Sequence, residues 1–313
     1  VVLYFIWIMT AQPGMIPAIL FMGAFAVPAA VVMFIFEMNT PRNVSLVLVG
    51  QLFVIGGLAG LCMALFEYQI SLISSLPGPV EETAKLAAVI LVARSLRYKY
   101  ELNGILFGCA VGAGFACFET CAYALGFLGN GGFLSADVLP ELSRAVTDMA
   151  NASSPVAALF AQKELQQAYS DALAAMISAL KSRGLLSPFG HPVWTAIAAG
   201  ALWRVKQDKP LKISMLMDTR FLKAFAIPVV LHSLWDITVT FPHLFNPTTQ
   251  SQANTDQYIM YGLYAVLAVV AWYVLFGLIQ QGLRQVKDEQ KEHLQSTLAN
   301  VEAAMATPAG GTA

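Results

Sequence analysis

Residues 103–127 read NGILFGCAVGAGFACFETCAYALGF, a stretch that is typical of a membrane-spanning helix. It contains no Lys, Arg or Asp, and it exceeds the ~20 apolar residues that a helix needs to cross a bilayer. Three glycines four residues apart, Gly104, Gly108 and Gly112, form a row that lets another helix approach closely in lipid. We therefore predict a membrane-spanning helix that packs tightly against a neighbour and carries one acidic residue, Glu119.

The composition of the whole chain agrees with this interpretation. Of its 313 residues, 57% are hydrophobic and 12% are charged, whereas soluble domains contain roughly 25% charged residues. The formal net charge is -1, so no general charge attracts nucleic acid, and we expect no nucleic-acid partner. We expect an integral membrane protein whose surroundings are the lipid bilayer.

Seven segments are long and apolar enough, or nearly so, to span a membrane. They are residues 15–37, 44–66, 77–94, 103–127, 189–203, 221–241 and 258–282. Residues 1–9 look like the end of an eighth span. Because the alternating pattern of transmembrane β-strands is absent, we predict an all-α, polytopic transmembrane helix bundle of seven to eight spans.

Lys and Arg residues orient the bundle, because they gather in cytoplasmic connections. Basic side chains occur at 94–99, at 204–223 and in the C-terminal tail, whereas 67–76 and 242–257 contain none. We therefore expect the C-terminus in the cytoplasm. The connections at 67–76, 128–188 and 242–257 are then expected on the extracytoplasmic side.

The long connection divides the chain into parts. We expect N-terminal spans in 1–127, an extracytoplasmic insertion in 128–188, C-terminal spans in 189–282 and a cytoplasmic tail in 283–313. Within the insertion, apolar residues recur at helical spacing over 155–183. Such a helix either packs on the bundle or lies at the interface, or it forms a lid that screens substrates. The sequence leaves both alternatives open.

Ionisable residues inside the spans are functional candidates, because charge in hydrocarbon is costly. They are Glu81, Glu82, Lys85, Glu119, His191, His232 and Asp236, with Tyr123 and Thr195 as polar companions. They belong to four spans, and in each span they fall in the half nearest the extracytoplasmic side. Scattered structural pairs would not be expected to agree in depth. We therefore predict a single buried site that opens to that side.

The spacing of these residues places several of them on shared helix faces, because residues three or four apart are neighbours on a helix. Such pairs are Glu81 with Lys85, Glu82 with Lys85, Glu119 with Tyr123, and His232 with Asp236. The sequence Pro77-Gly78-Pro79 predicts a helix start, which puts both glutamates near the positive end of the helix dipole. Carboxylates under such opposing influences of burial and charge are suited to general-base chemistry.

Four motifs also occur in order on successive spans. They are EETAK at 81–85 (EExxK), FETCAY at 118–123 (FExxxY), His191 at the start of its span, and HSLWD at 232–236 (HxxxD). Together they resemble the PrsW family of intramembrane proteases, which is similar to the type II CAAX prenyl endopeptidases and the bacterial abortive-infection proteases. The resemblance covers about residues 15–282. It implies hydrolysis of peptide bonds in membrane-anchored proteins, and it favours a prokaryotic inner membrane.

The resemblance assigns roles to the glutamate motifs. It implies that Glu81 is the general base that activates water, and that Glu82 and Lys85 tune or orient this base. Glu119 and Tyr123 would complete the water-binding side of the site. The family resembles a glutamic-type protease, so we expect no cofactor, although zinc is possible because the family was earlier grouped with metalloproteases.

The resemblance also assigns roles to the histidines and names a partner. His191 would assist on the water-binding side, while His232 and Asp236 would stabilise the oxyanion. The best-described family role is the first cleavage of a membrane-anchored anti-sigma factor in regulated intramembrane proteolysis. A membrane-anchored protein, with an anti-sigma-factor-like protein as one example, is therefore the expected substrate.

Three other functions stay open from the residues alone. A zinc metalloprotease would hold its metal with His191, His232 and Glu119, although the HExxH signature of helical zinc proteases is absent. A proton-coupled carrier would use the same buried groups as a proton relay. A non-catalytic scaffold would use them as polar pairs that lock helices together.

Overall fold

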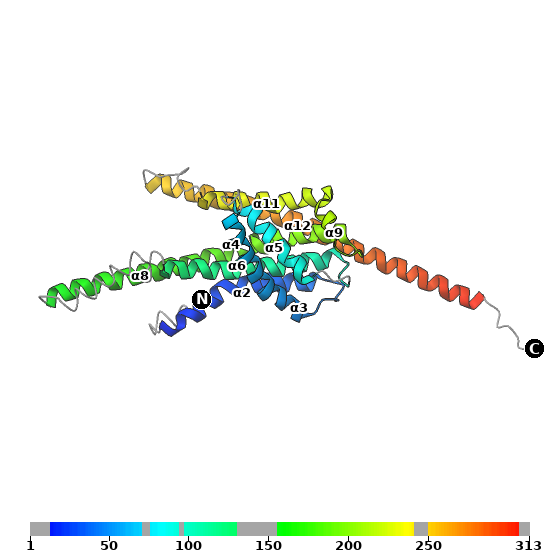
Figure 1. Cartoon of the computed structure of the whole chain (residues 1–313), viewed down its shortest axis with the longest axis horizontal. Coiled ribbons are helices and arrows are strands. Elements are labelled where there is room, and N and C mark those ends of the chain that lie inside the picture. The colour runs from blue at the N-terminus through cyan, green and yellow to red at the C-terminus, as the bar shows by residue number, and fades with distance from the viewer. Residues whose placement is uncertain (1–12, 71–75, 94–96, 130–154, 241–249, 307–313) are drawn as a thin grey trace, which may run out of the picture.

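The computed structural model describes residues 13–70, 76–93, 97–129, 155–240 and 250–306. In this part of the chain every regular element is helical, which confirms the predicted all-α class. The helices form a central bundle, and α8 (Pro155–Leu186) and the end of α12 (Gln250–Ala306) leave it in opposite directions (Figure 1). The expected end of an eighth span at residues 1–9 lies outside the described residues.

The remaining elements follow the predicted spans with small shifts at their ends. They are η1 (Pro13–Met15), α2 (Ile16–Met38), α3 (Leu46–Gln51), η2 (Leu52–Gly56), α4 (Gly57–Ile70), α5 (Pro77–Ala93), α6 (Glu101–Gly129), η3 (Ser187–Phe189), α9 (His191–Lys206), α10 (Ile213–Leu216) and α11 (Thr219–Thr240). The short π-helix η2 continues α3 into α4, so this span runs from Leu46 to Ile70. Helix α12 passes through the expected boundary at 282/283 without a break.

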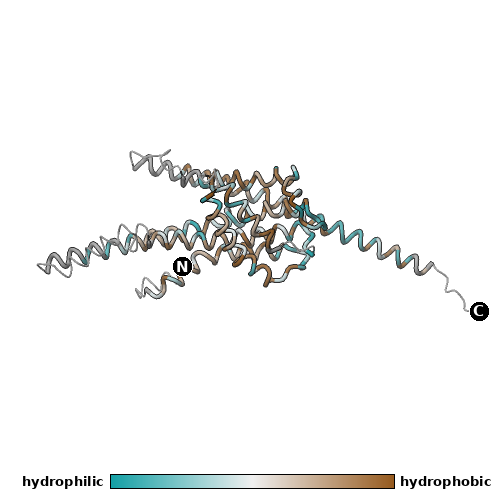
Figure 2. The backbone as a smooth tube through the Cα atoms, viewed as in Figure 1, coloured by the Kyte–Doolittle hydropathy of each residue, from teal (hydrophilic) through white to brown (hydrophobic). Residues whose placement is uncertain are grey.

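Four of the described helices are long and apolar enough to cross a membrane. They cover Ile16–Met38, Leu46–Ile70, Glu101–Phe127 and Tyr258–Glu302. The other three predicted spans are not among these four: α5 and α9 have only 17 and 16 residues, and α11 has 22. Helix α9 is nevertheless buried from Pro192 to Trp203, so neighbouring helices screen most of it from the surroundings. In Figure 2 hydrophobic residues cover much of the bundle, whereas the projecting end of α12 is largely hydrophilic.

The glycine row of α6 packs tightly against a neighbouring helix, as the sequence predicts, and the structure shows that this neighbour is α9. A Cβ atom added to Gly104 would lie 2.6 Å from the Cβ of Trp203. One added to Gly108 or Gly112 would collide with a backbone carbonyl oxygen of α9. Because the oxygen facing Gly112 belongs to His191, this row fixes the start of α9 beside the half of α6 that carries Glu119.

The start of α5 packs closely against α11. A Cβ atom at Gly78 would lie 2.6 Å from the carbonyl oxygen of Val229 and would collide with the hydroxyl of Ser233. The first turns of α5 therefore lie directly on the part of α11 that precedes Asp236. This contact brings Glu81 and its neighbours to the level of His232.

The C-terminal half of α8 packs on α2 and α6. Its apolar side chains form a cluster with both helices, consisting of Ile19, Ala24, Ala124, Leu173, Met176, Ile177 and Leu180. These α8 positions belong to the apolar face predicted within 155–183. Over this half the helix is packed on the bundle, which is one of the two predicted alternatives, while its other half projects beyond the bundle (Figure 1).

Candidate active site

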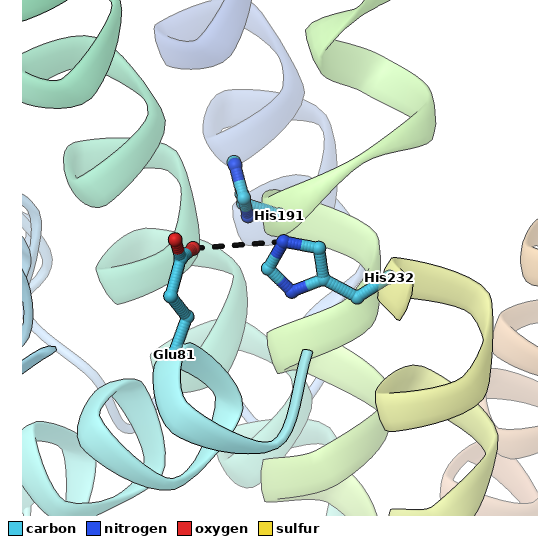
Figure 3. A group of neighbouring side chains, drawn as sticks. All are labelled: Glu81, His191 and His232. Carbon is cyan, nitrogen blue, oxygen red and sulfur yellow. Dashed lines mark ion pairs between the residues drawn. The ribbon is translucent and has the colours of Figure 1, made fainter. Parts of the chain in front are cut away.

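Four helices bring the predicted polar residues together at one end of the bundle. Helix α5 supplies Glu81, Glu82 and Lys85, α6 supplies Glu119, α9 supplies His191, and α11 supplies His232 and Asp236. Figure 3 shows the side chains of Glu81, His191 and His232 close together, with a dashed line joining Glu81 to His232. The packed half of α8 contributes to the same end of the bundle.

Lys85 lies at the centre of this cluster and is fully buried. Its Nζ lies 2.8 Å from Oε1 of Glu82, 3.5 Å from Oε2 of Glu81 and 2.8 Å from Nδ1 of His191. The ammonium also lies 4.3 Å from the centroid of the Phe115 ring. A buried ammonium is tolerated only with such partners. Lys85 therefore joins both glutamates of α5 to the histidine of α9.

His232 contacts three carboxylates. Its Nδ1 lies 3.0 Å from Oε1 of Glu82, and its Nε2 lies 3.0 Å from Oδ2 of Asp236 and 3.5 Å from Oε2 of Glu81. Both ring nitrogens face carboxylate oxygens, so the imidazolium, with two N–H donors, is the form that satisfies both. The indole of Trp194 stacks on this ring at 4.6 Å between centroids and restricts its rotation.

Glu119 joins the cluster to α8. Its Oε2 lies 3.0 Å from Nε2 of His191 and is also paired with the guanidinium of Arg183. Arg183 donates a further hydrogen bond to Thr120 at 3.3 Å, and its guanidinium lies 4.3 Å from the centroid of the Tyr123 ring. Tyr123 thus contacts the site through Arg183, although the sequence places it on the same face as Glu119.

A cavity of about 640 Å³ opens beside the cluster. Its lining includes Tyr68, Glu81, Glu119, Tyr123, Arg183, His191 and Asp236. The side chains of Glu82, Lys85 and His232 lie behind this wall and are at most 1% exposed. The site therefore has an outer layer that can contact a substrate and an inner layer that holds the outer one in place.

Comparison with protein families matches residues 15–147 and 157–278 to a family described as the PrsW family intramembrane metalloprotease. The chain belongs to the PrsW family. The matched ranges include all four motif helices of the cluster, so the resemblance carried by these motifs is confirmed. As a PrsW family member with apolar helices of spanning length, the chain is an integral membrane protein of an intramembrane protease family. Neither a curated protein nor a solved structure gives a significant match.

The PrsW family description raises the question of a metal ion. Glu81, His191 and His232 place one possible ligand atom each within 4.8 Å of one another, and this is the group found among the described residues. Two imidazoles and a carboxylate form a donor set that zinc accepts, so these residues fit the metal in kind. The sequence predicts Glu119 as the carboxylate ligand of this metal, whereas the structure groups Glu81 with the two histidines. A metal at Nδ1 of His191 would displace Lys85, whose Nζ lies 2.8 Å away.

Two further residues of this candidate site belong to none of the four motifs of the PrsW family resemblance. Tyr68 follows the end of the span expected at 44–66, and its hydroxyl donates a hydrogen bond to Oε1 of Glu81 at 3.0 Å. Arg183 belongs to the segment interpreted as extramembrane. Its nearness in the chain to His191 is the feature that could have indicated Arg183, since only the end of α8 and η3 lie between these two residues. Tyr68 had no comparable signal.

Proposed function

We propose that this chain is an intramembrane endopeptidase that hydrolyses peptide bonds of membrane-anchored proteins near the extracytoplasmic face. The observation that carries the proposal is the position of Glu81. It lines the cavity, while Lys85 and His232 hold it from the buried side. Amide hydrolysis requires a base for water, a donor for the oxyanion and a proton for the leaving amine. The cluster contains groups for all three tasks.

Glu81 is the general base in this proposal. Its Oε2 lies 3.5 Å from both Nζ of Lys85 and Nε2 of His232, and these two groups hold the carboxylate in place from the buried side. A water molecule in the cavity gives a proton to this carboxylate as it attacks the scissile carbonyl carbon. Glu82 acts from the inner layer, where it holds Lys85 and His232 at 2.8 and 3.0 Å.

Two histidines are candidates for oxyanion stabilisation. The PrsW resemblance gives this role to His232 with Asp236, but His232 is 1% exposed and its Nε2 faces carboxylates. His191 lines the cavity, and one of its ring nitrogens lies within 4.8 Å of a carboxylate oxygen of Glu81. We therefore assign His191 to the substrate side, with Glu119 orienting it, and His232 to the support of Glu81 and Asp236. Tyr123 forms part of the cavity wall together with Arg183.

A zinc-dependent mechanism is the second candidate, because the family description names a metalloprotease. Glu81, His191 and His232 would hold the ion, and bound zinc would polarise a carbonyl and lower the pKa of its water. The glutamic mechanism is favoured because Lys85 already places a cation at His191. Elemental analysis of the purified protein, with cleavage measured before and after chelation, distinguishes the two. Stoichiometric zinc and loss of cleavage on chelation would favour the metal.

The proposal includes a topology of seven spans. Helices α5, α9 and α11 would cross the membrane beside the longer helices, with their buried polar residues turned toward one another and away from lipid. Placing Arg284, Lys287 and Lys291, which follow the last span, in the cytoplasm puts α8 and the cavity on the extracytoplasmic side of a prokaryotic inner membrane. Cleavage there fits the first step of regulated intramembrane proteolysis, with an anti-sigma-factor-like protein as one possible substrate.

Mass spectrometry of new peptide N-termini tests the proposal. Membranes containing the wild type, Glu81→Gln or the control Glu37→Gln would be compared, since Glu37 is exposed and lies outside the cluster. We expect termini near extracytoplasmic membrane anchors with the wild type and Glu37→Gln, and their absence with Glu81→Gln. Identical termini from all three proteins, inserted at equal levels, would contradict the proposal.

A further inference from the structure

The two oxygens of the Glu81 carboxylate have different surroundings. Oε2 faces the inner layer, with Lys85 and His232 each at 3.5 Å. Oε1 accepts a hydrogen bond from the hydroxyl of Tyr68 at 3.0 Å. Tyr68 and Glu81 both line the cavity, whereas Lys85 and His232 do not. Oε1 and the Tyr68 hydroxyl therefore form a donor–acceptor pair on the substrate side of the carboxylate.

We propose that Tyr68 is a catalytic residue whose hydroxyl stabilises the oxyanion formed during peptide hydrolysis. This assignment rests on the proposed function, with Glu81 as the base. In the resting site the Tyr68 hydroxyl donates to the ionised Glu81. Because Lys85 and His232 surround Oε2, the proton removed from water goes to Oε1. Oε1 then becomes a hydroxyl and a weaker acceptor, which releases the O–H of Tyr68 for a new partner.

The new partner is the oxyanion, which forms within reach of the Tyr68 hydroxyl. The water that Oε1 deprotonates forms its new bond to the carbonyl carbon. The carbonyl oxygen is therefore only one bond further from Oε1 than the carbon is. Negative charge develops on that oxygen at the moment when Tyr68 loses its acceptor. A donor that is already held at the site costs little reorganisation, which is the condition under which such donors are most effective.

The step balances in atoms and electrons. One O–H bond of water breaks, its proton moves to Oε1, and the freed pair on oxygen forms the new C–O bond. The carbonyl π pair moves onto oxygen, where Tyr68 donates its hydrogen bond. Collapse re-forms C=O and breaks C–N, and Glu81 returns the proton to the amine nitrogen. Tyr68 keeps its own proton throughout, and the products are a carboxylic acid and an amine.

Other donors on the cavity wall are engaged differently. Arg183 is paired with Glu119 and donates to Thr120. His191 is held between Glu119 and Lys85. Tyr68 differs because its acceptor is Oε1 of Glu81, the oxygen that receives the proton from water. Protonation of Oε1 therefore leaves the Tyr68 hydroxyl available to donate to the oxyanion.

Steady-state kinetics of Tyr68→Phe test the assignment. The probe is a purified reporter that carries the bond found by comparing N-termini from wild type and Glu81→Gln. We expect kcat to fall about 100-fold, as for the loss of other oxyanion donors, with KM within about twofold of the wild type. Tyr258→Phe, whose side chain is exposed on α12, serves as the control and should keep the wild-type kcat.

A phosphinate analogue of the reporter peptide separates catalysis from folding, because its tetrahedral anionic group takes the place of the oxyanion. We expect Tyr68→Phe to bind it about 100-fold more weakly than the wild type. Unchanged kcat or unchanged phosphinate affinity in Tyr68→Phe, with Glu81→Gln inactive, would overturn the role of Tyr68 alone. Equal N-termini from wild type and Glu81→Gln would remove the proposed function, and the assignment of Tyr68 with it.

Discussion

Among single residues, Lys85 lies fully buried at the centre of the cluster. It carries a full charge at a site with no exposed surface, and it contacts both glutamates of α5 and the histidine of α9. Removing one partner of a buried ion pair costs more than the pair contributes, because the remaining charge stays buried without compensation. The stability of the site and its chemistry therefore depend on the same ammonium.

We expect Lys85→Met to lower the free energy of unfolding by about 3–5 kcal/mol and to abolish cleavage, because Glu82 would remain buried with only His232 as a charged partner. Thermal unfolding in detergent measures the first effect, and reporter cleavage measures the second. Lys223→Met, at an exposed position of α11, provides the control and should change the free energy by no more than about 0.5 kcal/mol. Wild-type stability in Lys85→Met would contradict this account of the cluster.

Much of the site was predictable at this scale, because depth in a span and helical spacing are local properties. Glu81, Glu119, His191 and Asp236 share one cavity wall, as their common depth suggests. The division into layers was not predictable. His232 looks as accessible as Asp236 in the sequence, yet Trp194 covers it in the structure. Such facts depend on which helices are neighbours, which the pattern of spans does not determine.

The position of Tyr68 also depends on which helices are neighbours, and for this reason the sequence does not reveal it. It belongs to no motif, and it reaches Glu81 only because α4 continues beyond residue 66 and packs beside α5. A residue whose role depends on where one helix ends and another passes cannot be found from its own surroundings in the chain. The structure adds the lateral order of the helices, and with it this hydroxyl.

At the scale of helices, the contact between α6 and α9 positions His191. We expect Gly112→Ala to cost about 1–3 kcal/mol and to reduce cleavage, because the added methyl would collide with the carbonyl oxygen of His191 and displace the start of α9. The matched control is Gly126→Ala on the same helix, where a Cβ meets no atom within 4 Å. Unfolding temperature and kcat measured on both variants test this expectation. Equal behaviour of the two would contradict it.

Helix α11 depends on the residue that precedes it. Oδ1 of Asp218 accepts the backbone N–H of Arg220 at 2.8 Å, the usual geometry of an N-terminal cap. Hydrogen bonds from the Arg220 side chain and from the backbone hold the pKa of Asp218 at about 2. Because this folded-state pKa lies below the unfolded value of ~3.9, the stabilisation is complete above that value and is lost as the pH falls toward 2.

Asp218→Asn keeps the cap acceptor and removes the charge. We therefore expect the unfolding temperature of the wild type to fall more steeply between pH 4 and pH 2 than that of Asp218→Asn, measured in the same detergent. At neutral pH the wild type should be the more stable of the two, because only its carboxylate forms the ion pair with Arg220. Parallel curves over this pH interval would contradict the proposed contribution of the charge.

The helices themselves were largely predictable, since spans of apolar residues set both their position and their approximate ends. The count of spans was harder to establish. Four described helices have the length and composition of spans, α5 and α9 are shorter, and α11 is long enough but is not among the four. The physical reason is burial, since a helix covered by other helices can be short and polar where a lipid-facing helix cannot. Sequence alone does not tell these two environments apart.

At the scale of the whole molecule, the two ends of the bundle differ in character. One end carries the cavity and α8, and the other carries the hydrophilic continuation of α12 (Figure 1, Figure 2). Because these projections leave from opposite ends, a bilayer around the apolar belt would separate them. The side on which a substrate is cut is then fixed by the orientation of the chain in the membrane, and not by the chemistry of the cluster.

Single cysteines on the two projections test this orientation. Ser170 of α8 and Ser296 of α12 are both exposed. We expect Ser170→Cys to react with a membrane-impermeant maleimide in intact cells, and Ser296→Cys to react only after the inner membrane is opened, because Lys and Arg residues follow the last span and favour the cytoplasm. The wild type, whose own cysteines are buried or lie in apolar helices, gives the background. Labelling of Ser296→Cys in intact cells, with Ser170→Cys protected, would reverse the topology and place the cavity on the cytoplasmic side, where cleavage of extracytoplasmic anchors is ruled out.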